Sequence, residues 1–280
     1  MKLPPASERI YMRLGISSSL SNLTPHEWAE KLSAIGCRSV VFPVDCNADS
    51  ALIDEYVSEA ASHDLLIAEV GIWRNALDSD PAKRKANLDY SVAQLQLADR
   101  IGARCAVNVA GALGPRWDGG YKENFSSQAW EMTVSMIQEV IDRAAPKRTV
   151  FTIESMPWMI PTGPEEYLKL IKAVNRDRFA VHLDIINMIN CPQRYFFSDD
   201  FLDHCFELLG DKIVSCHLKD IRLLDEYTFR LEECACGDGT FNISKYISLA
   251  SSFDADMPMI IEHLGSDEAY FESVAGVLKK

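Results

Sequence analysis

The sequence has no apolar run that approaches the about 18 residues needed to cross a bilayer. Its first residues, MKLPP, also lack the apolar segment of a secretory signal. We therefore expect a soluble, cytoplasmic protein with no membrane partner. Hydrophobic residues make up 48% of the chain and charged residues 25%, which excludes a disordered, collagen-like or coiled-coil chain and predicts a large packed core.

Positive charge is also scarce. The 280 residues include 28 Lys and Arg against 41 Asp and Glu, which gives a formal net charge of −13. Because nonspecific affinity for nucleic acid comes mostly from Lys and Arg that neutralise phosphates, we expect no nucleic-acid partner. The eight cysteines are scattered, and the close pair Cys234 and Cys236 has no second pair to complete a zinc motif. The sequence therefore predicts reduced thiols.

Short apolar runs rich in β-branched residues recur along the whole chain, and a stretch with helical spacing follows each of them. Eight of these runs are expected to be buried strands, at residues 13–19, 39–44, 66–73, 105–111, 149–156, 179–187, 213–220 and 258–264. Helices are expected at 50–63, 83–101, 126–145, 199–209 and 244–253. Two more helices should begin at the capping sequences Thr24-Pro25-His26-Glu27 and Thr162-Gly163-Pro164-Glu165.

Eight strands that alternate with helices favour an α/β fold of the (β/α)8 TIM barrel type, because buried parallel strands need crossover helices. A doubly wound open sheet is the alternative. It would require a Gly-rich phosphate-binding turn after the first strand, and Gly15-Ile16-Ser17-Ser18-Ser19 does not have that pattern. Linkers, tandem repeats and low-complexity tracts are missing from the sequence, so we expect a single domain over residues 1–280.

Ionisable residues follow the apolar runs of the last four expected strands. These strands end in Ile153-Glu154-Ser155, His182-Leu183-Asp184, His217-Leu218-Lys219-Asp220 and Ile261-Glu262-His263. Active sites of TIM barrels lie at the C-terminal ends of the strands. Any single one of these ends could be a solvated terminus or a salt-bridged pair, but four in succession favour a functional site.

The carboxylates of Glu154, Asp184 and Glu262 would repel one another at the barrel mouth unless a cation lay between them. Together with the imidazole of His217 they form an oxygen-rich set with one nitrogen ligand. This set suits one divalent metal ion, with Mn²⁺ preferred and Mg²⁺, Co²⁺ or Zn²⁺ as alternatives.

The motifs IES, HLD, CHLKD and IIEH on the last four expected strands, with Gly237-Asp238-Gly239 between the last two, resemble the xylose isomerase-like sugar phosphate isomerase/epimerase superfamily. The resemblance covers nearly the whole chain and implies a xylose isomerase-like TIM barrel. It also implies that Glu154, Asp184, His217 and Glu262 hold one divalent metal, and that Glu154 and Glu262 act as acid and base. The family's ketose 3-epimerases carry a histidine at the position of Asn187, so that substrate contact is altered here.

A divalent ion bound to the carbonyl and a neighbouring hydroxyl of a ketose stabilises the charge that develops when the adjacent carbon loses its proton. We therefore expect a metal-dependent isomerase or epimerase that acts on a free sugar, a keto-sugar derivative or a cyclitol, with Glu154 and Glu262 transferring the proton. A lyase or dehydratase, either of the inosose dehydratase kind or eliminating from a keto-glycoside, shares the first step and is the alternative.

Two other functions are less favoured. A phosphodiesterase of the endonuclease IV type would need a three-metal cluster with many His ligands and a basic surface, and the chain has six His. A non-catalytic sugar-binding barrel is also left open. Superfamily members are often dimers or tetramers, so a homo-oligomer is left open as well.

Further polar side chains are predicted to line the substrate pocket. Lys219 and Asp220 would supply a hydroxyl contact and a proton relay, or simply form an ion pair with each other. His182 alternates in phase with Asp184, which favours a place behind the metal ligands, whereas His263 should point away from Glu262. The remaining candidates for substrate contact are Asn187, Glu69, Asn108 and Trp117.

Overall fold

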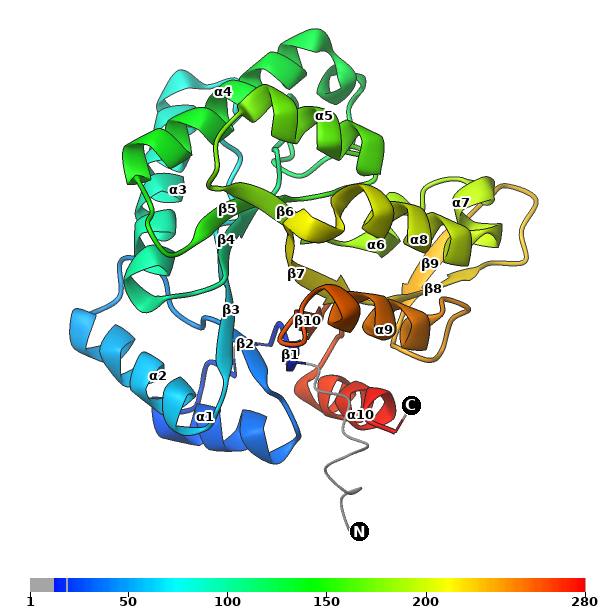
Figure 1. Cartoon of the computed structure of the whole chain (residues 1–280). Helices are drawn as coiled ribbons and strands as arrows, with labels where there is room; N and C mark the ends of the chain where they lie inside the picture. The colour runs from blue at the N-terminus through cyan, green and yellow to red at the C-terminus, as the bar shows by residue number, and fades with distance from the viewer. Residues whose placement is uncertain (1–12, 19, 280) are drawn as a thin grey trace.

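The computed structural model describes residues 13–18 and 20–279, so the N-terminal MKLPP and Ser19 of the first expected strand lie outside the described residues. Its centre is a nearly closed barrel of eight parallel strands, which confirms the predicted fold (Figure 1). In sheet order the strands are β1 (Arg13–Ile16), β10 (Pro258–Ile261), β7 (Ile213–Leu218), β6 (Phe179–Leu183), β5 (Val150–Glu154), β4 (Cys105–Asn108), β3 (Leu66–Gly71) and β2 (Ser39–Val41).

The two ends of this order, β1 and β2, approach each other closely. The Arg38 N–H donates to the Leu14 carbonyl at 2.7 Å, and the Ser39 hydroxyl donates to the Arg13 carbonyl, also at 2.7 Å. Gly15 makes this approach possible, because a Cβ at this position would lie 2.5 Å from the Ser39 carbonyl oxygen.

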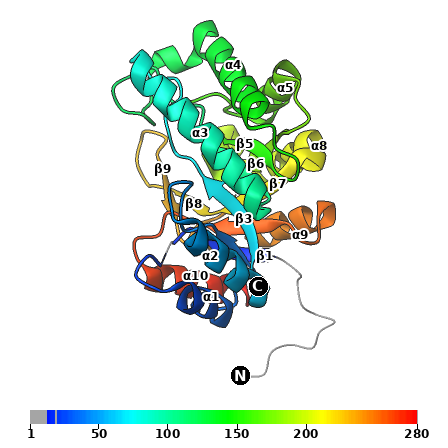
Figure 2. The same ribbon diagram turned by 90° about the vertical axis from the view of Figure 1, so that its left-hand side faces the viewer.

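Helices cover the outside of the barrel, as Figures 1 and 2 show. The longer ones are α1 (Pro25–Ala34), α2 (Ser50–Ser62), α3 (Pro81–Ile101), α4 (Ser127–Ala144), α5 (Pro164–Val174), α8 (Ser198–Leu209), α9 (Ile243–Phe253) and α10 (Asp267–Val277). The short helices α6 (Ile185–Met188) and α7 (Pro192–Phe196) lie between β6 and α8. Among the described residues, none of the helices has the length and apolar character that crossing a membrane requires.

The structure confirms the first capping sequence and corrects the second. The Thr24 hydroxyl accepts from the Glu27 N–H, and the Thr24 N–H donates to the Glu27 carboxylate at 2.9 Å, which is a complete capping box. At α5 the N-cap is Gly163, and Thr162 instead donates its N–H to Glu166 at 2.8 Å. The glutamate that pairs with Thr162 is therefore Glu166, one residue further along the chain than the expected Glu165.

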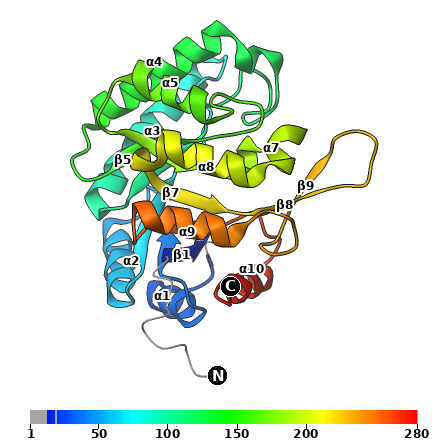
Figure 3. The same cartoon turned by 45° about the vertical axis from the view of Figure 1, so that its right-hand side comes forward.

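A hairpin that the sequence analysis did not predict follows β7. Its antiparallel strands are β8 (Asp220–Leu223) and β9 (Leu231–Cys234), and it projects beside α9 in Figure 3. The expected seventh strand, 213–220, therefore ends early, at Leu218, and the chain turns into the hairpin at Asp220. This turn places Glu233 of β9 beside the C-terminal ends of the barrel strands.

Tyr167 of α5 holds together the two strands that carry the first two candidate ligands. Its side chain is fully buried, and its hydroxyl donates to the Ile153 carbonyl of β5 at 2.6 Å. The same oxygen lies 3.1 Å from the Ala180 carbonyl of β6. The apolar face of α5 thus positions β5 and β6, whose last residues lead directly into the candidate site.

Candidate metal centre

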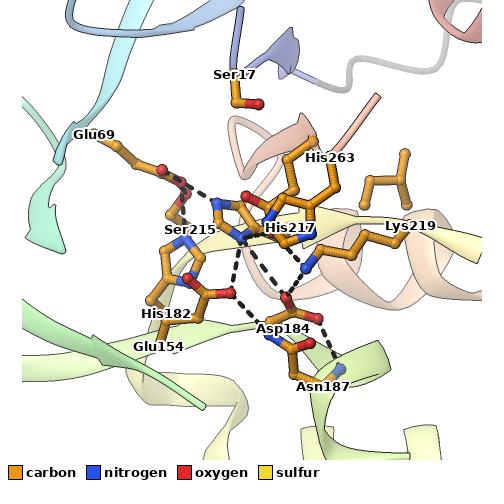
Figure 4. Close-up of polar contacts among 12 residues, drawn as sticks. Ser17, Glu69, Glu154, His182, Asp184, Asn187, Ser215, His217, Lys219 and His263 are labelled. Atoms are coloured by element: carbon orange, nitrogen blue, oxygen red, sulfur yellow. Dashed lines mark hydrogen bonds and ion pairs between the residues drawn. The ribbon is translucent and has the colours of Figure 1, made fainter. Parts of the chain in front are cut away.

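Four predicted ligands meet at the C-terminal ends of neighbouring strands. Glu154 is the last residue of β5, Asp184 follows β6, His217 is the next-to-last residue of β7, and Glu262 follows β10. All four side chains are buried, and one ligand atom from each lies within 4.8 Å of the others. Figure 4 shows Glu154, Asp184 and His217 pointing toward one another.

The Nδ1 atom of His217 lies at the centre of this group. It is 2.8 Å from Glu262 Oε1, 3.3 Å from Glu154 Oε1 and 3.7 Å from Asp184 Oδ2. Three carboxylates and one imidazole nitrogen therefore face one small space, which is the donor set of a site for a divalent ion.

Burial acts to raise the pKa of all three carboxyl groups, and neighbouring charges reinforce or oppose this effect. Burial, together with the charges of Glu262 and Asp184, raises the pKa of Glu154. Burial would also raise the pKa of Asp184, but Lys219 and His217 hold it well below its ordinary value. Against the same effect of burial, His217 and Lys219 lower the pKa of Glu262 to about 2. Two of the three carboxylates are thus kept ionised and available to a cation.

Two carboxylate oxygens of the site have unused lone pairs. Asp184 Oδ2 and Glu262 Oε1 are buried, and neither has a hydrogen-bond partner within the described part of the chain. Lys219 Nζ lies 2.6 Å from the first and 2.5 Å from the second, but these contacts lack hydrogen-bond geometry. Buried oxygens without aligned donors are uncommon, and they fit a site that holds a cation.

The position of Lys219 corrects one of the two interpretations of the Lys219-Asp220 pair. Lys219 is fully buried, and its ammonium contacts Glu262 and also Asp184, the second of which Figure 4 shows. Among the described residues its ion pairs are with these carboxylates and Glu233, and not with Asp220. Its Nζ also lies 3.7 Å from Glu233 of β9. Its predicted contact with a substrate hydroxyl stays a prediction.

Asp220 organises the loop after the hairpin. Its carboxylate accepts the N–H groups of Ile221, Gly237 and Phe241 at 2.8, 2.9 and 2.9 Å. Gly237 has a φ of +106°, a conformation that glycine adopts at little cost. The buried carboxylate of Asp220 therefore has a structural role in this loop, and its expected proton relay to substrate stays a prediction.

A second buried group lies behind the candidate ligands and involves Glu69 of β3. Glu69 Oε1 is 2.9 Å from His182 Nε2 and accepts from the Ser215 hydroxyl at 2.5 Å, while Oε2 is 3.4 Å from His217 Nε2. Burial would raise the pKa of Glu69, but His182 and His217 lower it. Glu69 and His182 are 1% and 0% exposed and make their contacts within the barrel, and the substrate contacts predicted for these two residues stay predictions.

Asn187 joins two of the candidate ligands. Its backbone N–H donates to Asp184 Oδ1 and its side-chain amide donates to Glu154 Oε1, both at 3.0 Å. Asn187 belongs to the short helix α6, which begins directly after Asp184. A contact between Asn187 and substrate remains a prediction.

Asn108 and Trp117, the other two predicted pocket residues, lie in different surroundings. Asn108 is fully buried, and its amide exchanges hydrogen bonds of 3.1 and 3.0 Å with the Arg74 backbone. Its contact with substrate stays a prediction. Trp117 is 39% exposed and lies between Arg116 and Asp118, which form an ion pair. Its contact with substrate stays a prediction.

The sequence analysis did not place His263 and Glu233 at the site. His263 Nε2 lies 3.5 Å from Glu262 Oε1, and Nδ1 lies 3.1 Å from Glu233 Oε1. Alternation along a strand predicted the opposite direction for His263, but β10 ends at Ile261 and His263 has a φ of +61°. Ser215 was also missed, although it is two residues from His217 and so lies on the same face of β7.

A sequence model of the xylose isomerase-like TIM barrel family matches residues 29–280. No curated protein sequence matches the chain.

Solved structures with the same fold cover most of the chain. The probable 3-DHS dehydratase AsbF from Bacillus anthracis has a TM-score of 0.73 at 15% identity, over 96% of this chain and 97% of that one. The 3-keto-D-glucoside 4-epimerase YcjR from E. coli has a TM-score of 0.70 at 13% identity, over 96% and 100%. A xylose isomerase-like TIM barrel protein from Mycobacterium smegmatis, in complex with magnesium, has a TM-score of 0.66 at 17% identity, over 92% and 89%.

Proposed function

We propose that this chain, which belongs to the xylose isomerase-like TIM barrel family, is a metal-dependent isomerase or epimerase that removes a proton beside the carbonyl of a sugar, keto-sugar derivative or cyclitol. One observation carries the proposal, which is the convergence of Glu154, Asp184, His217 and Glu262 on one buried space. Such a convergence at the C-terminal strand ends is where TIM barrels carry out their chemistry.

The donor set fits a divalent ion. Asp184 Oδ2 and Glu262 Oε1 are buried without hydrogen-bond partners among the described residues, and Glu154 and His217 Nδ1 complete the set. When bound, such an ion acts as a Lewis acid that polarises a carbonyl. Three oxygen donors with one nitrogen suit Mn²⁺ first, with Mg²⁺, Co²⁺ and Zn²⁺ as alternatives. The solved structure with magnesium supports a divalent ion on this fold.

In this proposal, Glu154 and Glu262 exchange a proton with substrate from two sides. They come from β5 and β10, and β6 and β7 lie between these strands in the sheet. Each carboxylate has its own orienting group, because Asn187 donates to Glu154 and Lys219 lies 2.5 Å from Glu262. One glutamate would remove the proton and the other would return it at the opposite face or at the neighbouring carbon.

The experiment that tests this proposal combines metal analysis with product analysis. We expect one divalent ion per chain after Mn²⁺ loading, and weaker binding in His217→Ala, measured by elemental analysis and calorimetry. A screen of keto-sugars should then give a product of unchanged mass. Loss of water or of an aglycone would assign a dehydratase or lyase instead, and a wild-type protein that retains no metal after loading would contradict the proposal.

A further inference from the structure

We propose that Glu69 is a positioning residue that holds the Nε2–H of His217, so that the lone pair of Nδ1 faces the candidate metal site. The proposal rests on the proposed function in one respect, which is that His217 ligates the metal through Nδ1. Figure 4 shows Glu69 on one side of the His217 ring, with Asp184 and Glu154 on the other.

The two oxygens of Glu69 have different partners. Oε1 is engaged by two groups, His182 Nε2 at 2.9 Å and the Ser215 hydroxyl at 2.5 Å. Oε2 is the atom that faces His217 Nε2, at 3.4 Å. His217 thus turns Nε2 toward Glu69 and Nδ1 toward Glu262 and Glu154. A carboxylate accepts hydrogen bonds, so a metal bound at Nδ1 would leave Nε2 as the nitrogen that carries the proton and donates it to Glu69.

Burial makes this arrangement rigid. Glu69 and His217 are each 1% exposed, and His182 and Ser215 are fully buried. A carboxylate in such surroundings is stable only while donors surround it, so the partners of Glu69 cannot turn away without leaving a buried charge unsatisfied. Glu69 comes from β3 and Ser215 and His217 from β7, so the contact crosses the barrel and ties the ligand to the opposite wall.

The same atoms allow a different role, as ligands of a second ion. One ligand atom each from Glu69, His182 and His217 lies within 4.8 Å of the others. We favour positioning, because hydrogen-bond contacts of 2.9 and 2.5 Å already occupy Glu69 Oε1. Metal stoichiometry separates the two roles.

Glu69→Gln is the informative variant. Two groups hold the position of Oε1, so the amide oxygen of the new side chain should stay there and its NH₂ should face His217 Nε2. Two donors would then oppose each other, and His217 would have to move its proton to Nδ1, where it blocks the metal. Loss of such an outer carboxylate typically weakens metal binding by about 10–100-fold. Ser215→Ala is the matched control, because it removes a partner of Oε1 without touching His217.

The measurements are the Mn²⁺ dissociation constant and stoichiometry by calorimetry, together with ¹⁵N-histidine NMR of the Zn²⁺-loaded protein. We expect one ion per chain, an affinity loss of about 10–100-fold in Glu69→Gln and less than about threefold in Ser215→Ala, and a wild-type His217 that is protonated on Nε2. Unchanged affinity in Glu69→Gln, or two ions in wild type of which Glu69→Gln loses one, would overturn the proposal.

The wild-type spectrum tests the proposal even if Glu69→Gln does not fold, because ligation through Nε2 of His217 would overturn it directly. The result is also separable from the proposed function. A protein that shows this tautomer and this loss of affinity but turns over no keto-sugar keeps the positioning role and loses the reaction. A wild-type protein that binds no metal overturns both.

Discussion

Lys219 Nζ lies 2.6 Å from Asp184 Oδ2, in the interior of the barrel and away from solvent. The same ammonium is 2.5 Å from Glu262 Oε1. It therefore compensates two of the buried carboxylates that are proposed to bind metal. The ammonium group of Lys219 thus supplies positive charge at the edge of the candidate site.

Lys219→Met should destabilise the metal-free protein strongly. Removal of one partner of a buried ion pair leaves an uncompensated charge and costs about 3–5 kcal/mol. A divalent ion would restore the balance of charge, so Mn²⁺ should raise the melting temperature of this variant more than that of wild type. Thermal unfolding with EDTA and with Mn²⁺ measures both effects. Lys172→Met, on the exposed surface of α5, is the control, and a Lys219→Met protein as stable as this control in EDTA would contradict the account.

Glu262→Gln and Glu154→Gln should lose turnover while they keep most of their metal affinity. Each amide keeps an oxygen ligand and nearly the same volume but removes the basic group, so the exchange of substrate protons should fall by about 10²–10⁴-fold. The Mn²⁺ dissociation constant should rise only moderately. Glu272→Gln, exposed on α10, is the matched control. If both site variants exchange protons at the wild-type rate, these carboxylates are ligands alone.

Asp99 gives a pH-dependent contribution to stability far from the site. Its Oδ1 accepts the N–H groups of Lys147, Arg148 and Thr149 at 2.8, 2.6 and 3.1 Å. Burial would raise its pKa, but these three bonds lower it. A carboxyl group with a lowered folded pKa stabilises the protein above its unfolded pKa of about 3.9, and this contribution is lost as the pH falls through the folded pKa.

Asp99→Asn keeps the accepting oxygen and removes the charge. We expect it to lower the free energy of unfolding at pH 7 by about 0.5–1 kcal/mol, because partial exposure screens the charge. The difference from wild type should disappear in strong acid. Urea unfolding at several pH values measures it, and a difference that grows toward low pH would show that the sign is wrong.

The barrel and the four candidate ligands could be predicted because both follow from local pattern. Each apolar run predicts one buried strand, and an ionisable residue at its end predicts the mouth of the barrel. Glu154 and Asp184 lie where this reasoning places them, at the ends of β5 and β6.

The surroundings of the ligands could not be predicted in the same way. Strand alternation no longer applies after Leu218 and Ile261, so the directions of Lys219 and His263 depend on the turns that follow. The contact of Glu69 with His217 requires the barrel to close, because the two residues are 148 positions apart in the chain. The strand β9, which brings Glu233 to the site, has no buried residue and so leaves no apolar pattern in the sequence.

Proton exchange in D₂O tests the central claim most directly. The wild-type protein loaded with Mn²⁺ would be incubated in D₂O with a panel of keto-sugars and keto-cyclitols, and mass spectrometry would follow both deuterium incorporation and product mass. The account predicts that deuterium enters the carbon beside the carbonyl of at least one compound, and that EDTA abolishes the exchange until Mn²⁺ is restored. Exchange that continues at the same rate after the metal is removed, or no exchange with any compound by the metal-loaded protein, would contradict it.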